Sequence, residues 1–365
     1  MKKNVFALAA LTALGSALAG NAMAQSSVTI AGIVDAGLVR ETGGVNGTIN
    51  KLSSGTGSVS RLIFRGTEDL GNGLSAIFLL ESGFKVDTGE QDTAGSLFQR
   101  QSYVGLKSTS YGQLTMGRQY TPYYLTAGMG DPFSLGFAGN IKNLFPVGGN
   151  ATRASNTVLY MTPLYQGVGA EFAYSPGEQA GDNTAGTQLS AALGYTNGPL
   201  AVRLGYLNRN TDTASTITTP TVSRGISTNT MLTATYDFKV IKAFVTYGAD
   251  KGVVAGALPN TSNPYGSKVA PTASTDSREI LLGLTAPVAG GTLMASAISK
   301  DDRTHFNQDA RQYGIGYVYP LSKRTNVYTA YAKINNKNGA GYTVGNNGES
   351  GTGDTGFNLG LRHSF

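Results

Sequence analysis

Few side chains in this sequence could carry out covalent or metal chemistry. Cysteine is absent, which excludes thiolate nucleophiles, thiolate metal sites and disulfides. The two histidines, His305 and His363, are scattered, and no Gly-x-Ser-x-Gly turn leads from a strand into a helix. We therefore expect no catalytic residue, no metal site and no cofactor. The chemistry open to this chain is that of fixed charges acting on nearby ions and dipoles.

One long interval, residues 121–153, differs from the other gaps of the chain because it is rich in both apolar residues and glycine. An apolar loop needs a surface on which to pack. The interval therefore predicts a loop that folds inward, into a cavity that the rest of the chain encloses. Between Arg118 and Arg153 the charged residues are Asp131 and Lys142.

The first 24 residues predict a secretory signal peptide. Two lysines precede an apolar run over residues 5–19, and the small residues before Gln25 suit cleavage after Ala24. A membrane anchor is the alternative, but the run is shorter than the roughly 18 to 20 residues that a spanning helix needs. Removing 24 of the 365 residues would leave residues 25–365, and the loss of two lysines would lower the formal charge from +6 to +4. This mild charge does not indicate a nucleic-acid partner, which usually requires clustered basic residues.

Apolar residues alternate with small or polar residues over many short stretches of the remaining chain. A period of two gives a β-strand one apolar and one polar face. No segment after the leader resembles a helical membrane span, and fifty glycines with 14% charged residues suit many tight turns and a polar wall. Alternation alone fits either a soluble β-sandwich or a membrane barrel. Examples lie at residues 189–195, 200–206, 232–238 and 313–319.

The connections between these stretches favour the barrel. Seven short turns alternate with eight longer gaps, which makes fifteen connections and therefore sixteen strands. We predict an all-β fold, a transmembrane 16-stranded antiparallel β-barrel with short periplasmic turns, long outer loops and an inward-folded third loop over residues 121–153. A sandwich has no reason to sort its loops by length. The other long gaps are expected to be solvated, and they lie near residues 42–56, 87–97, 176–186, 211–225, 251–275, 301–309 and 335–353.

Strand alternation also predicts which way the first arginines point. Arg61 and Arg65 share one face of their strand with Ile63. An arginine that faces hydrocarbon near the bilayer midplane costs about 2 to 4 kcal/mol, so the lumen is the favoured side. Arg100 is ambiguous, because Val104 falls on its face and only a bulge or a position at the loop end of the strand would turn it inward. For each arginine, an ordinary lumen or rim charge is the alternative to a pore role.

The chain ends on an alternating strand. Phe357, Leu359, Leu361, His363 and Phe365 lie on one face, and Phe365 is the last residue. This pattern resembles the assembly signal of outer-membrane barrels, which implies recognition by the barrel assembly machinery. His363 stands where many such signals carry tyrosine, but it retains an aromatic ring.

More widely, the sequence resembles the Gram-negative general diffusion porins of the neisserial and betaproteobacterial kind. The resemblance covers the whole mature chain and implies a porin domain over residues 25–365. It implies a homotrimer of sixteen-stranded barrels in the cell outer membrane, in contact with membrane lipid and lipopolysaccharide, in which the third loop forms a constriction. The matching stretches are residues 27–35, 60–71, 117–118, 153–157, 160–163, 322–325 and 360–365.

In porins of this family, basic residues on the wall face carboxylates on the inward loop. The resemblance implies that Arg61, Arg100 and Arg153 are the basic residues on the wall. It implies that Asp131 is the carboxylate on the inward loop. Such porins often have two acids on the loop, and the Asp131-Pro132 pair fits a turn equally well. Further pore-lining candidates are Arg65, Arg118, Tyr120, Tyr124 and Lys142.

These features predict a water-filled channel for passive diffusion of small hydrophilic solutes and ions. Because arginines outnumber acids at the expected constriction, we expect a weak to moderate preference for anions that salt would screen. A solute-specific channel with a binding track at Tyr120, Tyr123 and Tyr124 is the alternative, and saturable current block by one solute would favour it. A surface adhesin or receptor is a third interpretation, although the outer loops contain no motif that we can assign to a partner.

Overall fold

The computed structural model describes residues 27–213, 223, 225–253 and 263–365, and the leader expected over residues 1–24 lies outside them. Among the described residues, no helix is both long enough and apolar enough to cross a bilayer. The described elements are β1 (Ser27–Thr42), β2 (Ile49–Ser54), β3 (Arg61–Gly71), β4 (Leu74–Gly83), β5 (Gln101–Ser108), β6 (Gly112–Tyr120), α2 (Pro122–Gly130), η1 (Ile141–Asn143), η2 (Gly149–Ala151), β7 (Arg153–Met161), β8 (Val168–Ser175), β9 (Gln188–Asn197), β10 (Leu200–Asn210), β11 (Ile226–Asp237), β12 (Lys242–Lys251), β13 (Asp276–Val288), β14 (Gly291–Asp302), β15 (Ala310–Pro320), β16 (Thr325–Asn336) and β17 (Thr355–Ser364).

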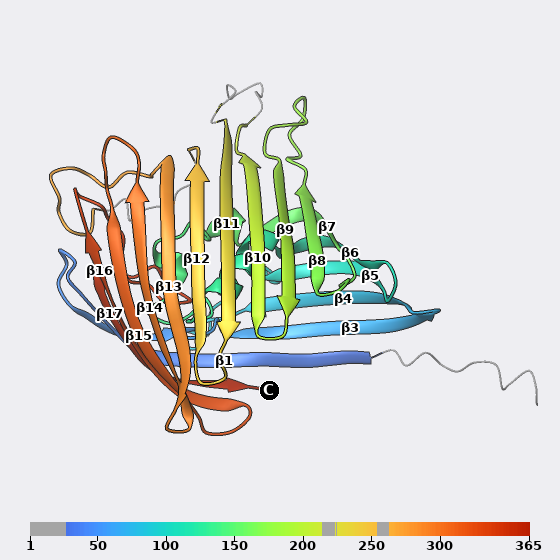
Figure 1. The fold of residues 1–365 in the computed structure, drawn as a ribbon, viewed down its shortest axis with the longest axis horizontal. Helices are drawn as coiled ribbons and strands as arrows, with labels where there is room; N and C mark the ends of the chain where they lie inside the picture. Colours follow the sequence, from blue (N-terminus) through green and yellow to red (C-terminus); the bar gives the residue numbers. More distant parts are fainter. Residues whose placement is uncertain (1–26, 214–222, 224, 254–262) are drawn as a thin grey trace, which may run out of the picture.

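The strands form one antiparallel sheet that closes on itself. From β3 onward each strand pairs with the next along the chain, and β17 returns to pair with β1, with Leu38 opposite Leu359. Closure leaves no unpaired sheet edge among the described strands, which is the arrangement that lets strands cross a lipid bilayer. Figure 1 shows, for β8 to β16, short connections at the lower ends of the strands and longer ones at the upper ends.

The seventeen strands of the described chain occupy sixteen positions around the ring, because β2 and β3 share one. Residues Ala36–Glu41 of β1 pair with β2, whereas Ser27–Ile33 of β1 pair with β3. The intervening residues 55–60 leave the ladder, and the Asp35 carboxylate accepts hydrogen bonds from the backbone N–H groups of Gly57 and Ser58. The prediction of a sixteen-stranded barrel is therefore confirmed. The short strand β2 lies within a gap that we had expected to be a solvated loop.

The wall has an apolar outer face and a polar inner face. Alternate residues such as Leu282 and Leu361 are 53% and 50% exposed, as expected for side chains that would contact lipid. Their neighbours on the inner face include buried polar residues such as Thr233, Thr246 and Asn358. The alternation read from the sequence is thus the alternation of a membrane barrel.

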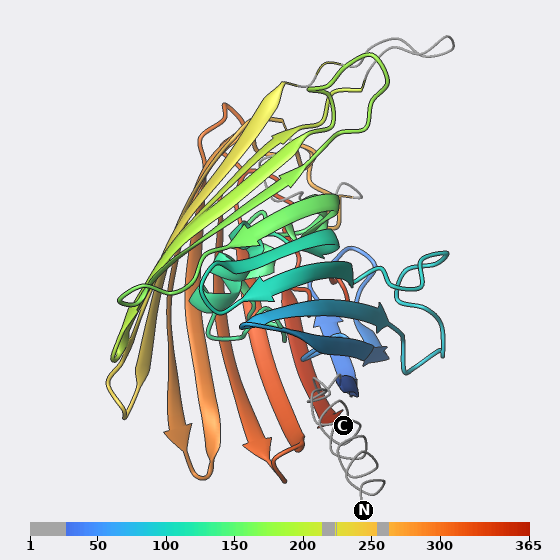
Figure 2. The ribbon, with the colours of Figure 1, turned by 90° about the vertical axis from the view of Figure 1, so that its right-hand side faces the viewer.

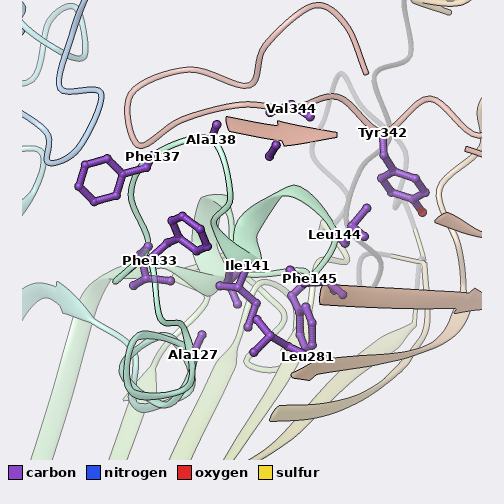
Figure 3. Close-up of a cluster of buried hydrophobic side chains, with 14 of the residues drawn as sticks. Ala127, Phe133, Phe137, Ala138, Ile141, Leu144, Phe145, Leu281, Tyr342 and Val344 are labelled. Carbon is purple, nitrogen blue, oxygen red and sulfur yellow. The ribbon is translucent and has the colours of Figure 1, made fainter. Parts of the chain in front are cut away.

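The segment between β6 and β7 packs inside the ring, where α2 contacts β9 to β12 (Figure 2). Its side chains belong to a buried apolar cluster that also contains wall residues such as Leu281, and Figure 3 shows Phe133, Ile141 and Phe145 of the segment in this cluster. Glycine in the wall allows this segment to approach closely, because a Cβ at Gly316 would lie 3.0 Å from the Phe133 ring. The apolar composition of the segment is explained by this interior position.

A second segment, residues 337–354 between β16 and β17, also turns inward. Tyr342 and Val344 are buried in the same apolar cluster (Figure 3). Gly345 N–H donates to Asn143 Oδ1 at 3.1 Å, which joins the two inward segments. The expectation of a solvated loop over residues 335–353 is therefore wrong, because its apolar side chains pack on the first inward segment.

Candidate functional site

A hydrogen-bonded chain of five side chains runs along the inner wall between β3 and β7. Glu81 of β4, 3% exposed, joins the first two arginines, because its Oε1 accepts hydrogen bonds from Arg61 Nη1 at 3.0 Å and from Arg100 Nε at 2.7 Å. Arg100 Nη2 donates to the Tyr120 hydroxyl at 2.6 Å, and Arg153 Nη2 donates to the same oxygen at 3.1 Å. The structure thus brings the three arginines together through one carboxylate and one hydroxyl. We call these five residues the arginine cluster.

The course of the wall explains why two of these arginines face inward. Arg61 opens β3 and shares its face with Ile63, which pairs with Glu81 of β4. Arg100 lies one residue before β5, so strand alternation does not determine its direction. Within β5 the same parity leads to Val104, which is exposed on the outer face. The position of Arg100 at the loop end of the strand therefore resolves the ambiguity seen in the sequence.

Tyr120 is held at the junction of the wall and the inward segment. It ends β6 opposite Arg153, the first residue of β7, and its ring stacks on Tyr124 of α2 with centroids 5.1 Å apart. The Arg153 guanidinium lies 4.7 Å from the centre of the Tyr120 ring, a cation–π contact. Helix α2 begins at Pro122 and is capped by Thr121, whose hydroxyl accepts from Tyr124 N–H at 3.0 Å. The capped helix start thus fixes the tyrosine pair.

Asp131 lies apart from the arginine cluster and differs from our expectation. The residue is 1% exposed, and its carboxylate accepts hydrogen bonds from the backbone N–H groups of Phe133, Leu135 and Ile141 at 3.0, 2.8 and 3.2 Å. Leu135 has a φ of 65°, a left-handed conformation that needs such support in a bulky residue. Burial raises the pKa of Asp131 to about 6. The contacts of Asp131 are therefore those of a residue that stabilises a turn, and its carboxylate stabilises the backbone conformation of the inward segment.

Lys142 joins the two inward segments. Its Nζ donates to the backbone oxygen and to Oδ1 of Asn347, both at 3.2 Å. Enclosure by protein lowers the pKa of Lys142 to about 8, and the nearby positive charges of Arg100 and Arg153 act in the same direction. Glu349 on the second segment forms an ion pair with Lys51 of β2 at 2.7 Å.

These groups surround one cavity of about 330 Å³. Arg100, Arg153 and Lys142 line it together with the carboxylates of Asp92 and Glu349 and several amide and hydroxyl groups. In the described part of the chain, no group of three or more His, Asp or Glu side chains is suited to a metal ion. The arrangement can attract, repel and orient ions and dipoles in water, which is the chemistry of a selective passage.

Comparison with known proteins identifies the family. The profile of the Gram-negative porins matches residues 7–339. The chain belongs to the Gram-negative porin family. The resemblance read from the sequence is confirmed, and this porin lies in the cell outer membrane.

Several relatives of this porin are similar over nearly their whole length. An outer membrane porin protein of Bordetella pertussis is 33% identical over 378 residues, which cover 91% of this chain and 94% of the relative. Outer membrane porin protein 32 of Delftia acidovorans is 32% identical over 384 residues, which cover 100% of both. Among solved structures, the anion-selective porin from Comamonas acidovorans aligns with a TM-score of 0.71 and 29% identity, over 93% of this chain and 100% of that chain.

Two further arginines that we considered as pore-lining candidates lie outside the cluster. Arg65 shares the inner face of β3 with Arg61, four residues nearer the short turn, and borders a separate cavity with Lys107. Arg118 lies two residues after the exposed Met116 and has the same strand parity in β6. Its Nη1 donates to Ser155 Oγ at 2.9 Å. A register shift between Gly117 and Gln119 accompanies this orientation. Arg118 also donates from Nε to the backbone oxygen of Gln99, so its contacts lie outside the hydrogen-bonded arginine cluster.

The residues of the expected assembly signal form the outer face of β17. Phe357, Leu359 and Leu361 are exposed there, and His363 Nδ1 lies 2.9 Å from Thr325 Oγ1 of β16. Phe365 pairs through its backbone with Gly32 of β1. The final strand therefore closes the ring, and its role as a recognition signal stays a prediction.

The carboxylates that balance the cluster were not foreseen. Glu81 lies at an alternate position of an apolar strand, so the lipid-cost argument that we applied to Arg61 would also have placed it in the lumen. The same alternation would have placed Arg362 of β17 on the inner face, where the structure has it opposite Asp35 and close to Arg61. Glu349 gave no such signal, because nothing in its Gly/Asn-rich surroundings indicates that residues 337–354 fold inward.

Proposed function

We propose that this porin is a general diffusion channel whose constriction favours anions. The observation that carries the proposal is the arginine cluster, which contains three guanidinium groups and one carboxylate. Arg61 and Arg100 donate to Glu81, and Arg153 is joined to Arg100 through the Tyr120 hydroxyl. Lys142 adds a fourth cation beside the cavity, whereas Asp92 and Glu349 are the other acids on its lining. The positive charges thus outnumber the negative ones where the inward segments narrow the lumen.

The mechanism is electrostatic and requires no bound intermediate. Small solutes would diffuse down their gradient, and the opposed charges would orient water and dipolar solutes, which penalises apolar ones. The excess of positive charge lowers the energy of an anion and raises that of a cation in the constriction. The anion selectivity stated for the porin of Comamonas acidovorans supports this proposal. Nothing in the site suggests a nucleophile and base for catalysis, so we assign no enzymatic activity.

The alternative of a solute-specific channel would need an accessible aromatic track. Tyr120 is stacked on Tyr124 on one side and contacted by the Arg153 guanidinium, so its ring is already occupied. Flux of uncharged sugars of graded size into proteoliposomes separates the two functions. A general channel gives flux that rises linearly with concentration and falls with solute size. Saturation by one solute, with little flux of others of the same size, would favour the specific channel instead.

We also propose that the functional unit is a homotrimer. OmpT, an outer membrane protein of Vibrio cholerae with this fold, has been solved in a trimer form. In this chain the segment between β4 and β5 projects away from the wall (Figure 2) and exposes Leu97, which would suit a contact with a neighbouring subunit. Membrane lipid, lipopolysaccharide and the barrel assembly machinery are the further partners we propose, the last through β17. Conductance that opens in groups of three equal steps would support the trimer.

Neutralising the acid of the cluster should strengthen the anion preference. In Glu81→Gln the three arginines are no longer balanced, and a unit charge about 5 Å from an ion in water changes its energy by about 0.8 kcal/mol. Because this change has opposite sign for an anion and a cation, we expect the anion-to-cation permeability ratio to rise at least about fivefold at low salt. Reversal potentials across a KCl gradient measure this ratio. The exposed Glu90, paired with Lys85 at 3.2 Å and absent from the lining of the cavity, provides the control Glu90→Gln, which should leave the ratio unchanged.

The anion preference should fall as the pH rises from 7 to 9. Lys142, with its pKa lowered to about 8, loses its positive charge in this range, whereas Asp131, with a pKa of about 6, is ionised throughout. Arginine does not titrate there. Reversal potentials measured at both pH values should show the decrease in the unmodified porin and none in Lys142→Met. An equal decrease in that variant would assign the effect to another group.

A further inference from the structure

We infer that Tyr120 is the positioning residue of the selectivity cluster, because its hydroxyl holds Arg100 and Arg153 side by side. This inference rests on the proposed anion preference and names the residue that sets the geometry behind it. The Tyr120 oxygen accepts from Arg100 Nη2 at 2.6 Å and from Arg153 Nη2 at 3.1 Å. A phenol oxygen has two lone pairs, so the two guanidinium groups use its whole accepting capacity.

The two arginines depend on Tyr120 to different degrees. Arg100 is also held by Glu81 through a 2.7 Å ion pair. Across the described residues, no carboxylate lies within ion-pair distance of Arg153, and its buried Nε has no hydrogen-bond partner. The hydroxyl and ring of Tyr120 are therefore its principal anchor. Without the hydroxyl, repulsion from Arg100 would favour rotation of Arg153 away from the cluster.

Tyr120 itself is well placed to act as a rigid support. It ends a wall strand, its ring stacks on Tyr124 at an interplanar angle of 8°, and Tyr124 belongs to the capped start of α2. A tyrosine loses few rotamers when it is fixed in this way. The position of Arg153, and thus the local field, is coupled through Tyr120 to the position of the inward segment.

The test is a double-mutant cycle read as ion selectivity. Tyr120→Phe retains the ring and its stacking but removes the shared acceptor, and we expect the anion-to-cation permeability ratio to fall about two- to threefold while the porin folds and conducts. In an Arg153→Gln background the same change should have almost no further effect. A matched control is Tyr247→Phe on the outer face, where a tyrosine hydroxyl accepts from Arg278 at 3.0 Å and selectivity should not change.

Arg153→Lys distinguishes position from charge and does not depend on the folding of a Tyr120 variant. It keeps the positive charge but removes the planar group that reaches both the hydroxyl and the ring. We expect Arg153→Lys to lose about as much anion selectivity as Tyr120→Phe. Unchanged reversal potentials in Tyr120→Phe or Arg153→Lys would overturn it, as would an equal loss on adding Tyr120→Phe to Arg153→Gln. If the unmodified porin has no anion preference, the proposed function fails first.

Discussion

The double variant Arg100→Gln/Arg153→Gln should lose most of the anion preference and cross into cation preference. Two positive charges leave the cavity while Asp92 and Glu349 stay. Each unit charge changes the energy of an ion about 5 Å away by about 0.8 kcal/mol in water, with opposite sign for anions and cations, so the permeability ratio should change at least tenfold at low salt. Glu81 retains Arg61 at 3.0 Å and Gln101 at 2.8 Å, so its carboxylate is not left without a partner.

Reversal potentials at 0.1 M and 1 M mean salt provide the measurement for this variant. Because the Debye length falls from about 10 Å to about 3 Å over this range, the difference from the unmodified porin should shrink at high salt. Arg278→Gln is the control, because this arginine is exposed on the outer face beside Ile280 of β13. A double variant that keeps its anion preference at low salt would contradict the role of the cluster.

Lys300→Met should produce the largest loss of stability. Lys300 on β14 is fully buried, forms an ion pair with Glu279, and donates to Ser277 Oγ at 3.0 Å. The Tyr342 ring of the second inward segment lies 5.8 Å from Nζ. Removing the lysine leaves the buried Glu279 carboxylate without its cationic partner, although the Ser277 hydroxyl still donates to it, and the loss costs about 3 to 5 kcal/mol. Urea unfolding of the porin in lipid vesicles, followed by circular dichroism, measures the free energy of unfolding.

Two companion variants make this prediction specific. Lys300→Met/Glu279→Gln removes the uncompensated charge as well, so it should recover at least half of the lost stability. Lys337→Met breaks an exposed ion pair with Asp309 at 3.5 Å and should cost less than about 1 kcal/mol. If Lys300→Met and Lys337→Met were equally stable, the buried pair would not hold the wall and the second segment together.

Much of the barrel could be predicted because a membrane wall obeys a simple rule. Alternation with a period of two and the sorting of turns by length gave the strand number, and the cost of an arginine in lipid gave the inner face for Arg61. Arg100 escaped this rule, since it lies just outside β5 and the loop conformation determines its direction. The alternation rule therefore places strand residues and says little about residues at the loop ends.

The inner segments were predicted less completely, because their contacts are made across the lumen between distant parts of the chain. Asp131 was identified as a candidate, but its three backbone hydrogen bonds depend on left-handed residues that no local pattern specifies. Residues 337–354 look like a solvated loop until Tyr342 and Val344 meet the apolar surface that residues 121–153 provide. The packing of one inward segment was therefore needed before the second could be recognised.

The reversal potential of the purified, unmodified porin across a tenfold KCl gradient in a planar lipid bilayer tests the central claim most directly. An excess of positive charge at the constriction predicts a potential of the sign that corresponds to chloride permeating faster than potassium, and this potential should decrease as the mean salt concentration rises. A potential of the opposite sign at low salt would contradict the account.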